Sequence, residues 1–202
     1  PGRTSDAECL GRCSTGKYSD QPGRASDGEC LLCSAGKYSD QTGRTSDAEC
    51  LGRCSVGKYS DQPGRTSDAE CIGRCSVGKY SNQTGRISNV ECLGRCSIGK
   101  YSNRTGLSAD SECSLCSAGK WSSQLGITSD ESCFLCSAGK FSNQEGLTTD
   151  KQCDGTCSTG KYSSVPGLIS DAECQNCSEG KWLDLTGRTS RNDCKSCDAG
   201  KF

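Results

Sequence analysis

Large apolar side chains occur in this chain at one recurring position and not in long apolar runs. Ten of the eleven aromatic residues follow a Gly-Lys dipeptide and lie five positions after a cysteine. The segments between them are polar and show no helical period long enough for a real helix. The pattern therefore predicts strands of two to three residues around each Lys-aromatic pair. The ten aromatic residues are Tyr18, Tyr38, Tyr59, Tyr80, Tyr101, Trp121, Phe141, Tyr162, Trp182 and Phe202. We expect each ring to pack on a disulfide.

Cysteines define a repeat of 20 or 21 residues, and internal repeats set the fold class before any other signal. The 20 cysteines form ten close pairs, five spaced C-x3-C and five spaced C-x2-C. The second cysteine of each pair lies 17 positions before the first cysteine of the next pair in all nine cases. One unit reads C-S-x-G-K-aromatic-S-x-x-x-G-x-x-S-D-x-E-C with substitutions, so we expect about ten small units.

A glycine turn and a short acidic segment predict how each unit folds. Gln21-Pro22-Gly23-Arg24 has the residues of a type II turn, and its glycine recurs in all nine complete units. Ser5-Asp6-Ala7-Glu8 and its equivalents match a capping box, which favours one helical or 3₁₀ turn before each cysteine pair. The expected fold is an elongated rod or solenoid of disulfide-rich repeats with little regular secondary structure, each contacting only its neighbours.

Composition supports a covalently cross-linked scaffold. Cysteine makes up 20 of 202 residues, while all apolar residues together make up only 31%. Cross-links must therefore supply stability that a small apolar core cannot. The net charge is −1 with no charged arm, which argues against nucleic acid as a partner. The longest apolar runs have four residues, so we expect no membrane insertion in this segment.

The cysteines predict disulfides, with zinc as the alternative. The quartet Cys113, Cys116, Cys133 and Cys136 fits a zinc-site spacing. Disulfides are favoured because the distance between pairs is constant, as a covalent loop requires, whereas the spacing within a pair varies. An oxidising compartment also follows from disulfides. The predicted bonds are Cys13–Cys30, Cys33–Cys50, Cys54–Cys71, Cys75–Cys92, Cys96–Cys113, Cys116–Cys133, Cys136–Cys153, Cys157–Cys174 and Cys177–Cys194.

Two cysteines, Cys9 and Cys197, are left without a partner by this scheme. Pro1-Gly2-Arg3-Thr4-Ser5-Asp6 also matches the middle of a unit and not its start. We therefore expect residues 1–202 to be a single continuous array of repeats, cropped from a longer one, in which these two cysteines pair with further units.

Two N-glycosylation sequons recur at the same position of consecutive units. Asn82-Gln83-Thr84 and Asn103-Arg104-Thr105 both lie just before the glycine turn, where exposure is expected. We predict N-linked glycans on Asn82 and Asn103. The segment Asn176-Cys177-Ser178 also fits the sequon, but a disulfide cysteine at its centre speaks against occupancy.

Catalytic chemistry is not indicated by the residue types present. Histidine is absent, which removes the usual general base and the commonest neutral metal ligand. We expect no enzymatic activity and no cofactor. Acidic pairs such as Asp47 and Glu49 are interpreted as helix caps and solvated charge, with calcium binding as the alternative. The lysine of each unit is expected to form a solvated or inter-unit salt-bridging stripe.

Four consecutive units carry an apolar residue where most others carry arginine after the second glycine. We interpret these residues as a surface stripe that meets another chain. The four residues are Leu107, Ile127, Leu147 and Leu168.

The cysteine pattern resembles a known family. A Cys-x-x-Gly-x-aromatic opening, closed by a cysteine 17 positions on, is similar to the ephrin-receptor-like repeat of Eph-type receptor ectodomains. That repeat is related to tumour-necrosis-factor-receptor and EGF-like modules. Cys13, Gly16, Tyr18 and Cys30 carry the resemblance, and their equivalents extend it over essentially the whole chain. It implies one disulfide per loop and an elongated rod. Its members include receptor stalks, ligand-binding ectodomains and surface proteins of protists.

Regularity distinguishes this chain from receptor ectodomains, which usually mix module types. Ten nearly identical units present a repeating surface suited to assembly. We therefore expect an extracellular or cell-surface glycoprotein that forms a rod-like subunit of a filament, flagellar hair, wall or surface layer. Its partners would be copies of itself or other extracellular proteins. The alternative function is a ligand-binding or adhesion ectodomain of a cell-surface receptor.

Overall fold

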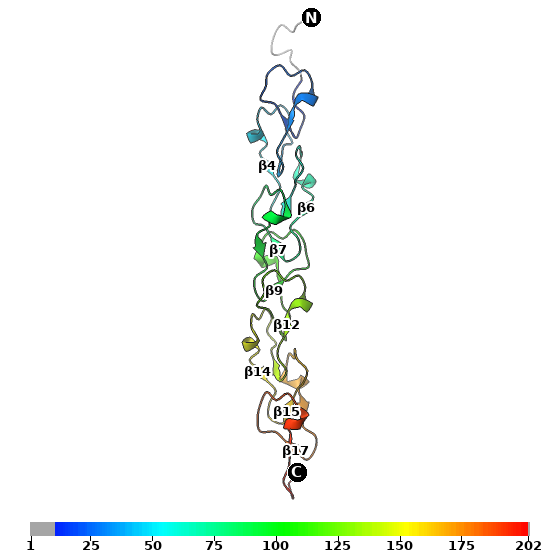
Figure 1. Ribbon diagram of the computed structural model, residues 1–202, viewed down its shortest axis with the longest axis vertical. Helices are drawn as coiled ribbons and strands as arrows, with labels where there is room; N and C mark the ends of the chain where they lie inside the picture. Colours follow the sequence, from blue (N-terminus) through cyan, green and yellow to red (C-terminus); the bar gives the residue numbers. More distant parts are fainter. Residues whose placement is uncertain (1–10, 202) are drawn as a thin grey trace. The chain divides into compact units, whose positions relative to one another are not determined.

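A computed structural model describes residues 11–201 (Figure 1). This part of the chain forms nine two-stranded sheets and nine 3₁₀ helices, and it contains no α-helix. The predicted class of small disulfide-rich repeats with short β and 3₁₀ segments is thereby confirmed. Cys9, the segment Ser5–Glu8 and Phe202 lie outside the described residues. No helix in residues 11–201 is long and apolar enough to cross a membrane.

The strands each have two residues and the 3₁₀ helices three. The strands are β1 (Lys17–Tyr18), β2 (Leu31–Leu32), β3 (Lys37–Tyr38), β4 (Gly52–Arg53), β5 (Lys58–Tyr59), β6 (Gly73–Arg74), β7 (Lys79–Tyr80), β8 (Gly94–Arg95), β9 (Lys100–Tyr101), β10 (Ser114–Leu115), β11 (Lys120–Trp121), β12 (Phe134–Leu135), β13 (Lys140–Phe141), β14 (Gly155–Thr156), β15 (Lys161–Tyr162), β16 (Gln175–Asn176), β17 (Lys181–Trp182) and β18 (Lys195–Ser196). The 3₁₀ helices are η2 (Asp27–Glu29), η3 (Asp47–Glu49), η4 (Asp68–Glu70), η5 (Asn89–Glu91), η6 (Asp110–Glu112), η7 (Asp130–Ser132), η8 (Asp150–Gln152), η9 (Asp171–Glu173) and η10 (Arg191–Asp193).

Each repeat is one hairpin closed by one disulfide. We number the repeats from the second cysteine of each pair, so repeat 1 begins at Cys13 and repeat 3 at Cys54. In repeat 1, β1 pairs antiparallel with β2, which places Tyr18 opposite Leu31. The Lys-aromatic strand predicted from the sequence is therefore the first strand of the hairpin. The residues between the two cysteines of the next pair form the second strand.

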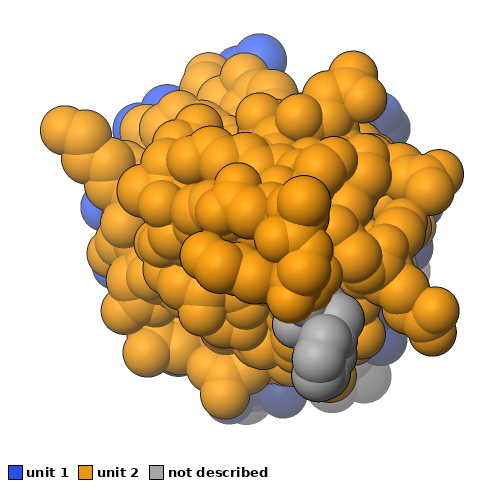
Figure 2. Space-filling view, turned by 90° about the horizontal axis from the view of Figure 1, so that it is seen from below, with its two compact units in different colours: residues 1–94, 104–112 blue, residues 95–103, 113–202 orange. Residues whose placement is uncertain are grey.

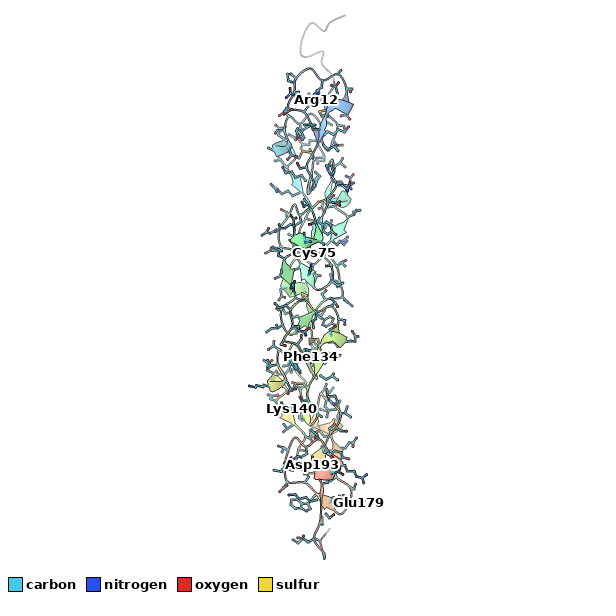
Figure 3. The ribbon with its side chains drawn as sticks, in the orientation of Figure 1. Arg12, Cys75, Phe134, Lys140, Glu179 and Asp193 are labelled. Carbon is cyan, nitrogen blue, oxygen red and sulfur yellow. A yellow bond between two sulfur atoms is a disulfide. The ribbon has the colours of Figure 1, made fainter. Side chains whose placement is uncertain are left out.

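Nine disulfides form in the described residues, and they are the predicted ones. Figure 3 draws them in yellow and labels Cys75, which bonds to Cys92. The zinc quartet is not assembled, because Cys113 bonds to Cys96, Cys116 to Cys133 and Cys136 to Cys153. Nine disulfides indicate an oxidising environment.

The two spacings within cysteine pairs correspond to two backbone conformations of the first cysteine. In C-x2-C pairs this residue is extended, with ψ 141° at Cys30 and 137° at Cys133. In C-x3-C pairs ψ falls to 79° at Cys50 and 81° at Cys71. The extra residue therefore forms a local bulge, and the pairing of the two hairpin strands is unchanged.

Every described C-x3-C pair has glycine at its middle position, and an aromatic ring covers that glycine. Tyr59 lies opposite Gly73 in the β5–β6 hairpin. A Cβ on Gly73 would lie 2.3 Å from Tyr59 Cε2 and would overlap the ring. Where the pair is C-x2-C, a side chain takes this place, as in the Trp121–Phe134 pair with ring centroids 5.0 Å apart.

Main-chain hydrogen bonds join each repeat to the next. The Gly16 N–H donates to Ser39 O at 2.8 Å, and the Gly43 N–H donates back to Cys13 O at 2.8 Å. A parallel bridge between Tyr18 and Arg44 lies between these bonds, and its equivalents recur along the chain. Successive repeats are thus held together by backbone groups whose pairing does not depend on side-chain identity.

A repeat also contacts the repeat two positions further along the chain. This differs from the expectation that each repeat contacts only its immediate neighbours. A Cβ on Gly16 would lie 2.4 Å from Gly64 O, and one on Gly57 would lie 2.2 Å from Gly106 O. The positive φ of Gly16, 75°, also disfavours any side chain there. In these repeats the glycine is required because two backbones approach closely at its Cα.

The core lies between consecutive repeats and is built on the disulfides. Tyr101 packs on Ile127 and on the Cys116–Cys133 disulfide of the next repeat. Trp121 and Phe141 pack in the same way on the Leu147 and Leu168 clusters. The expectation that the aromatic rings pack on disulfides is confirmed in these repeats.

The predicted apolar surface stripe is wrong. Leu107, Ile127, Leu147 and Leu168 are all buried, and none exposes more than 8% of its surface. Each follows a positive-φ glycine. Ile127, Leu147 and Leu168 pack against the aromatic residue of the preceding repeat and the disulfide of their own repeat. Four apolar residues in register therefore mark the core of four repeats and not an interface with another chain.

The chain divides into two compact units, shown in different colours in Figure 2. The first contains the described residues up to Gly94 together with Arg104–Glu112, and the second contains Arg95–Asn103 and the residues from Cys113 onward. Within each unit the same contacts between repeats recur, so both units use one structural rule.

Candidate interaction surface

A lysine–aspartate pair ties the two ends of most repeats together. In repeat 3, Lys58 Nζ lies 2.5 Å from Asp68 Oδ2. The same carboxylate accepts hydrogen bonds from the Ser55 N–H at 2.8 Å and the Ser55 hydroxyl at 3.0 Å. Asp68 begins η4, so the start of the repeat is fastened to the 3₁₀ turn that ends it. The same pair forms as Lys17–Asp27, Lys37–Asp47, Lys120–Asp130, Lys140–Asp150 and Lys161–Asp171.

These lysines pair within their own repeats, and this corrects the expected solvated or inter-unit stripe. Hydrogen bonds from Lys17 Nζ and from the Ser14 N–H lower the pKa of Asp27 from 3.8 to about 2. At Asp130, burial raises the pKa, but hydrogen bonds from Lys120 and Ser117 outweigh it and the pKa is lowered. The carboxylates are therefore held in their charged form.

Two repeats depart from this pattern. In repeat 4, Asn89 takes the place of aspartate and accepts from the Ser76 N–H at 2.9 Å. Lys79 thus has an amide where Lys58 has a carboxylate. In repeat 9, Arg191 stands at this position and donates to Ser178 Oγ at 2.9 Å.

The glutamate two residues after this aspartate caps the 3₁₀ helix differently from the predicted capping box. Glu49 accepts from the Thr45 N–H at 2.8 Å and the Thr45 hydroxyl at 3.0 Å, one residue before the expected Ser46. These bonds, the N–H first, lower the pKa of Glu49. The capping box itself forms at Thr149 and Ser190. The acidic side chains are thereby used inside the repeat, and residues 11–201 contain no cluster of metal-binding side chains.

Arginine replaces the buried leucine in repeats 2, 3 and 4. The guanidinium of Arg44 donates from Nη2 to Gln41 Oε1, and Arg86 donates likewise to Gln83. The Nε atoms of Arg44, Arg65 and Arg86 are buried without a hydrogen-bond partner in the described structure. A polar nitrogen is therefore buried at a position that holds an apolar side chain in repeats 5 to 8.

A hollow of about 230 Å³ lies beside Arg65 in repeat 3. Tyr59 and Ile72 form its apolar side, while Asp61, Gln62 and Arg65 form its polar side. The last two lining residues, Ser60 and Gly73, belong to the same hairpin and turn. The whole hollow is thus built from one repeat, and nearly the same residues recur in repeats 2 and 4.

In the C-x3-C pairs that close repeats 2, 3 and 4, the bulged residue is a highly exposed apolar side chain. Leu51, Ile72 and Leu93 expose 77%, 78% and 77% of their surface. The β-hairpin register directs them away from the core, because the paired positions are taken by the following glycine and arginine. Repeats 2, 3 and 4 therefore each present an apolar side chain to solvent at this position.

One of these features has a signal in the sequence, and another has none. Glycine occurs in every C-x3-C pair and in no C-x2-C pair, and this correlation could have predicted the ring packed over it. The hollow beside Arg65 left no separate signal, because its residues are spread from Tyr59 to Gly73. Asn82 and Asn103 are exposed in the turns before Gly85 and Gly106.

Comparisons with known proteins do not assign the chain to a family. No family model matches the chain. No curated protein matches it significantly.

Proposed function

We propose that the chain is an extracellular structural repeat protein, a rod-like subunit of a filament, flagellar hair, wall or surface layer. The observation that carries the proposal is the periodic main-chain contact between repeats. Each repeat binds the next through the same backbone hydrogen bonds, as between Gly16 and Ser39, and carries its own disulfide. Such an array is extended by adding repeats and does not depend on a closed core.

A periodic surface supports self-association of such subunits. Leu51, Ile72 and Leu93 recur once per repeat, each beside a tyrosine of its own hairpin. A surface with an exposed apolar side chain at the same position of successive repeats matches a partner of the same period, and a second copy of the chain has that period. The lysine and aspartate of repeats 2 and 3 pair with each other inside their own repeats.

The test is the assembly state of the native protein isolated from its source. Electron microscopy and analytical ultracentrifugation should show fibres or end-to-end oligomers built from the repeat array. A strictly monomeric native protein at all concentrations would contradict the proposal.

A ligand-binding or adhesion ectodomain is the second candidate, and the hollow of repeat 3 favours it. Tyr59, Ile72 and Arg65 bring an aromatic ring, an aliphatic side chain and a guanidinium to one place, which is the composition of protein-binding hot spots. Saturable binding of a monomeric array to a partner protein, lost on Ile72→Asp, would support this function. The resemblance to ephrin-receptor-like repeats is compatible with both candidates.

A further inference from the structure

The fold places the three N-glycosylation sequons in two different environments. Asn82 and Asn103 lie in exposed turns, and the hydroxyl residues Thr84 and Thr105 are exposed as well. Asn176 instead lies in β16, which is paired with β15, and the next residue, Cys177, is bonded to Cys194. The Ser178 hydroxyl of that third sequon accepts a hydrogen bond from Arg191.

The turn at Asn82 is held by groups other than those that the modification uses. The Ser81 hydroxyl accepts from the Gln83 N–H and donates to Gln83 O, both at 3.3 Å. Ser81 is buried, and the Gly85 N–H donates to Cys54 O at 2.8 Å. The turn therefore keeps its shape whether or not the Asn82 side chain carries a substituent.

A glycan at Asn82 would lie at the rim of an apolar surface. In repeat 3, Asp61 and Ile72 line the same hollow together with Tyr59. Their equivalents in repeat 4 are Asn82, Leu93 and Tyr80, and Leu93 is 77% exposed. The apolar faces of sugar rings pack on aliphatic and aromatic side chains, so the first sugars attached to Asn82 can cover Leu93.

We propose that Asn82 and Asn103 carry N-linked oligosaccharides, and that the glycan on Asn82 covers the exposed Leu93. The donor is a lipid-diphosphate-linked oligosaccharide. A bond forms between Asn Nδ2 and the anomeric carbon of the first sugar, the bond from that carbon to the phosphate oxygen breaks, and the Nδ2 proton leaves with the lipid diphosphate. Asn176 stays unmodified, because its chain segment is fixed in the disulfide-closed hairpin.

Occupancy is tested on the full chain secreted from a eukaryotic cell behind a signal peptide. Peptide-N-glycosidase digestion in ¹⁸O-water marks each occupied asparagine as labelled aspartate, which peptide mass spectrometry locates. We expect label at Asn82 and Asn103 in most molecules and none at Asn176 or at Asn143, whose equivalent turn has Glu145 in place of the hydroxyl residue. Absence of label at Asn82 and Asn103, or equal label at Asn176, overturns the assignment.

Coverage of Leu93 is tested by hydroxyl-radical footprinting of the glycosylated protein against Asn82→Gln and Asn103→Gln. We expect labelling of Leu93 to rise several-fold in Asn82→Gln only, while Ile72 in the glycan-free repeat 3 stays constant in all three proteins. Equal labelling of Leu93 in all three overturns the covering role.

The inference rests on the extracellular location in the proposed function and not on assembly. The signal peptide in the experiment directs the chain into the secretory pathway. A failed modification would therefore contradict the glycosylation sites and leave the proposed function untouched. A monomeric but glycosylated protein would contradict the filament and leave the sites in place.

Discussion

At the scale of the residue, two contacts decide which substitutions a repeat tolerates. One is the overlap of an aromatic ring with a glycine, as between Tyr59 and Gly73. The other is the carboxylate that fastens the two ends of a repeat, as in Asp68 with Ser55 and Lys58. In a polar, glycine-rich sequence neither residue stands out. The short distance to its partner nevertheless requires one residue type at each position.

Gly73→Ala should open the β5–β6 hairpin locally. The added methyl group would lie 2.3 Å from the Tyr59 ring, so either the ring or the strand must move. We expect a loss of roughly 2 kcal/mol in the opening free energy of repeat 3, measured by hydrogen exchange. The matched control is Gly28→Ala, where the nearest atom, Ser26 Oγ, is 3.6 Å away and other repeats already carry alanine. That control should be neutral or stabilising by about 0.5 kcal/mol. Equal loss in both variants would contradict the role of the ring.

Asn89→Asp should stabilise repeat 4 at neutral pH by about 0.5 kcal/mol, because it gives Lys79 the carboxylate that Lys58 has in Asp68. The folded-state pKa of such an aspartate is lowered, as for Asp68. The stabilisation is therefore present above the unfolded-state pKa of about 4 and is lost as the pH falls through the lower folded-state pKa. Hydrogen exchange of repeat 4 at neutral pH, and chemical denaturation over an acid pH series, measure this difference. A gain that persists at a pH below both pKa values would exclude the ion pair as its cause.

At the scale of the element, the residue after the second glycine separates two kinds of repeat. In repeats 5 to 8 this residue is a buried leucine or isoleucine, and in repeats 6 to 8 it packs beside a disulfide. In repeats 2 to 4 it is arginine, whose Nε is buried without a partner in the described structure. Both kinds keep a two-stranded hairpin closed by a disulfide across the same 17 positions.

Arg65→Leu should stabilise repeat 3. The substitution removes a buried nitrogen that has no hydrogen-bond partner and inserts the side chain that repeat 5 uses at Leu107. We expect a gain of about 1 kcal/mol in local opening free energy. Arg53→Leu, at an exposed site, is the control and should change it little. A loss of stability in Arg65→Leu would show that the contacts of the Arg65 guanidinium stabilise the repeat more than burial of the unpaired Nε destabilises it.

Leu147→Lys should unfold repeat 7 instead of loosening contacts with another chain. Leu147 packs between Trp121 and the Cys136–Cys153 disulfide, so a lysine there would place a charge in the core. We expect a loss of more than about 3 kcal/mol, seen as loss of exchange protection around Cys136. Leu125→Lys in repeat 6, at a side chain that is 58% exposed, should leave repeats 6 and 7 folded. Unchanged protection in Leu147→Lys would restore the interpretation of this residue as part of a surface stripe.

The sequence predicted covalent and local features well, and contacts between repeats poorly. The disulfides followed from the constant 17-position spacing, and the glycine turns from the need for positive φ at residues such as Gly23. Leu147 was misassigned because a repeat period shows that residues are equivalent but not which way they face. The contact between Gly16 and Gly64 involves backbone atoms only, and no side-chain pattern records it.

At the scale of the whole molecule, each repeat depends on the two that follow it within a unit. The first is joined by hydrogen bonds such as Gly57 N–H to Ser81 O, and the second by the close approach of Gly57 to Gly106. Unfolding of one repeat therefore removes contacts from two others on each side where they are present. This extends the range over which a local change is felt beyond that of a nearest-neighbour array.

An elongated shape remains a prediction for the isolated chain. If each repeat adds about 10 Å, ten repeats reach on the order of 100 Å. A compact domain of 202 residues has a radius of gyration of about 17 Å. Small-angle scattering of the oxidised monomer should give a radius of gyration well above this value and a distance distribution with a long tail. Full reduction should change both, because the repeats lose their cross-links. A radius near the compact value in the oxidised protein would contradict the rod.

The ψ of the first cysteine in each pair has a genetic consequence. A change from about 140° at Cys30 to about 80° at Cys50 absorbs one additional residue and leaves the hairpin register intact. Insertions or deletions of one codon between paired cysteines are thus tolerated when glycine is gained or lost with them. Loss or duplication of a complete 20- or 21-residue repeat also preserves every kind of contact. An inserted or deleted codon inside the 17-position disulfide loop cannot be accommodated by this change in ψ. Length variation among alleles of this gene is therefore expected in whole repeats and at the cysteine junctions, and not inside the loops.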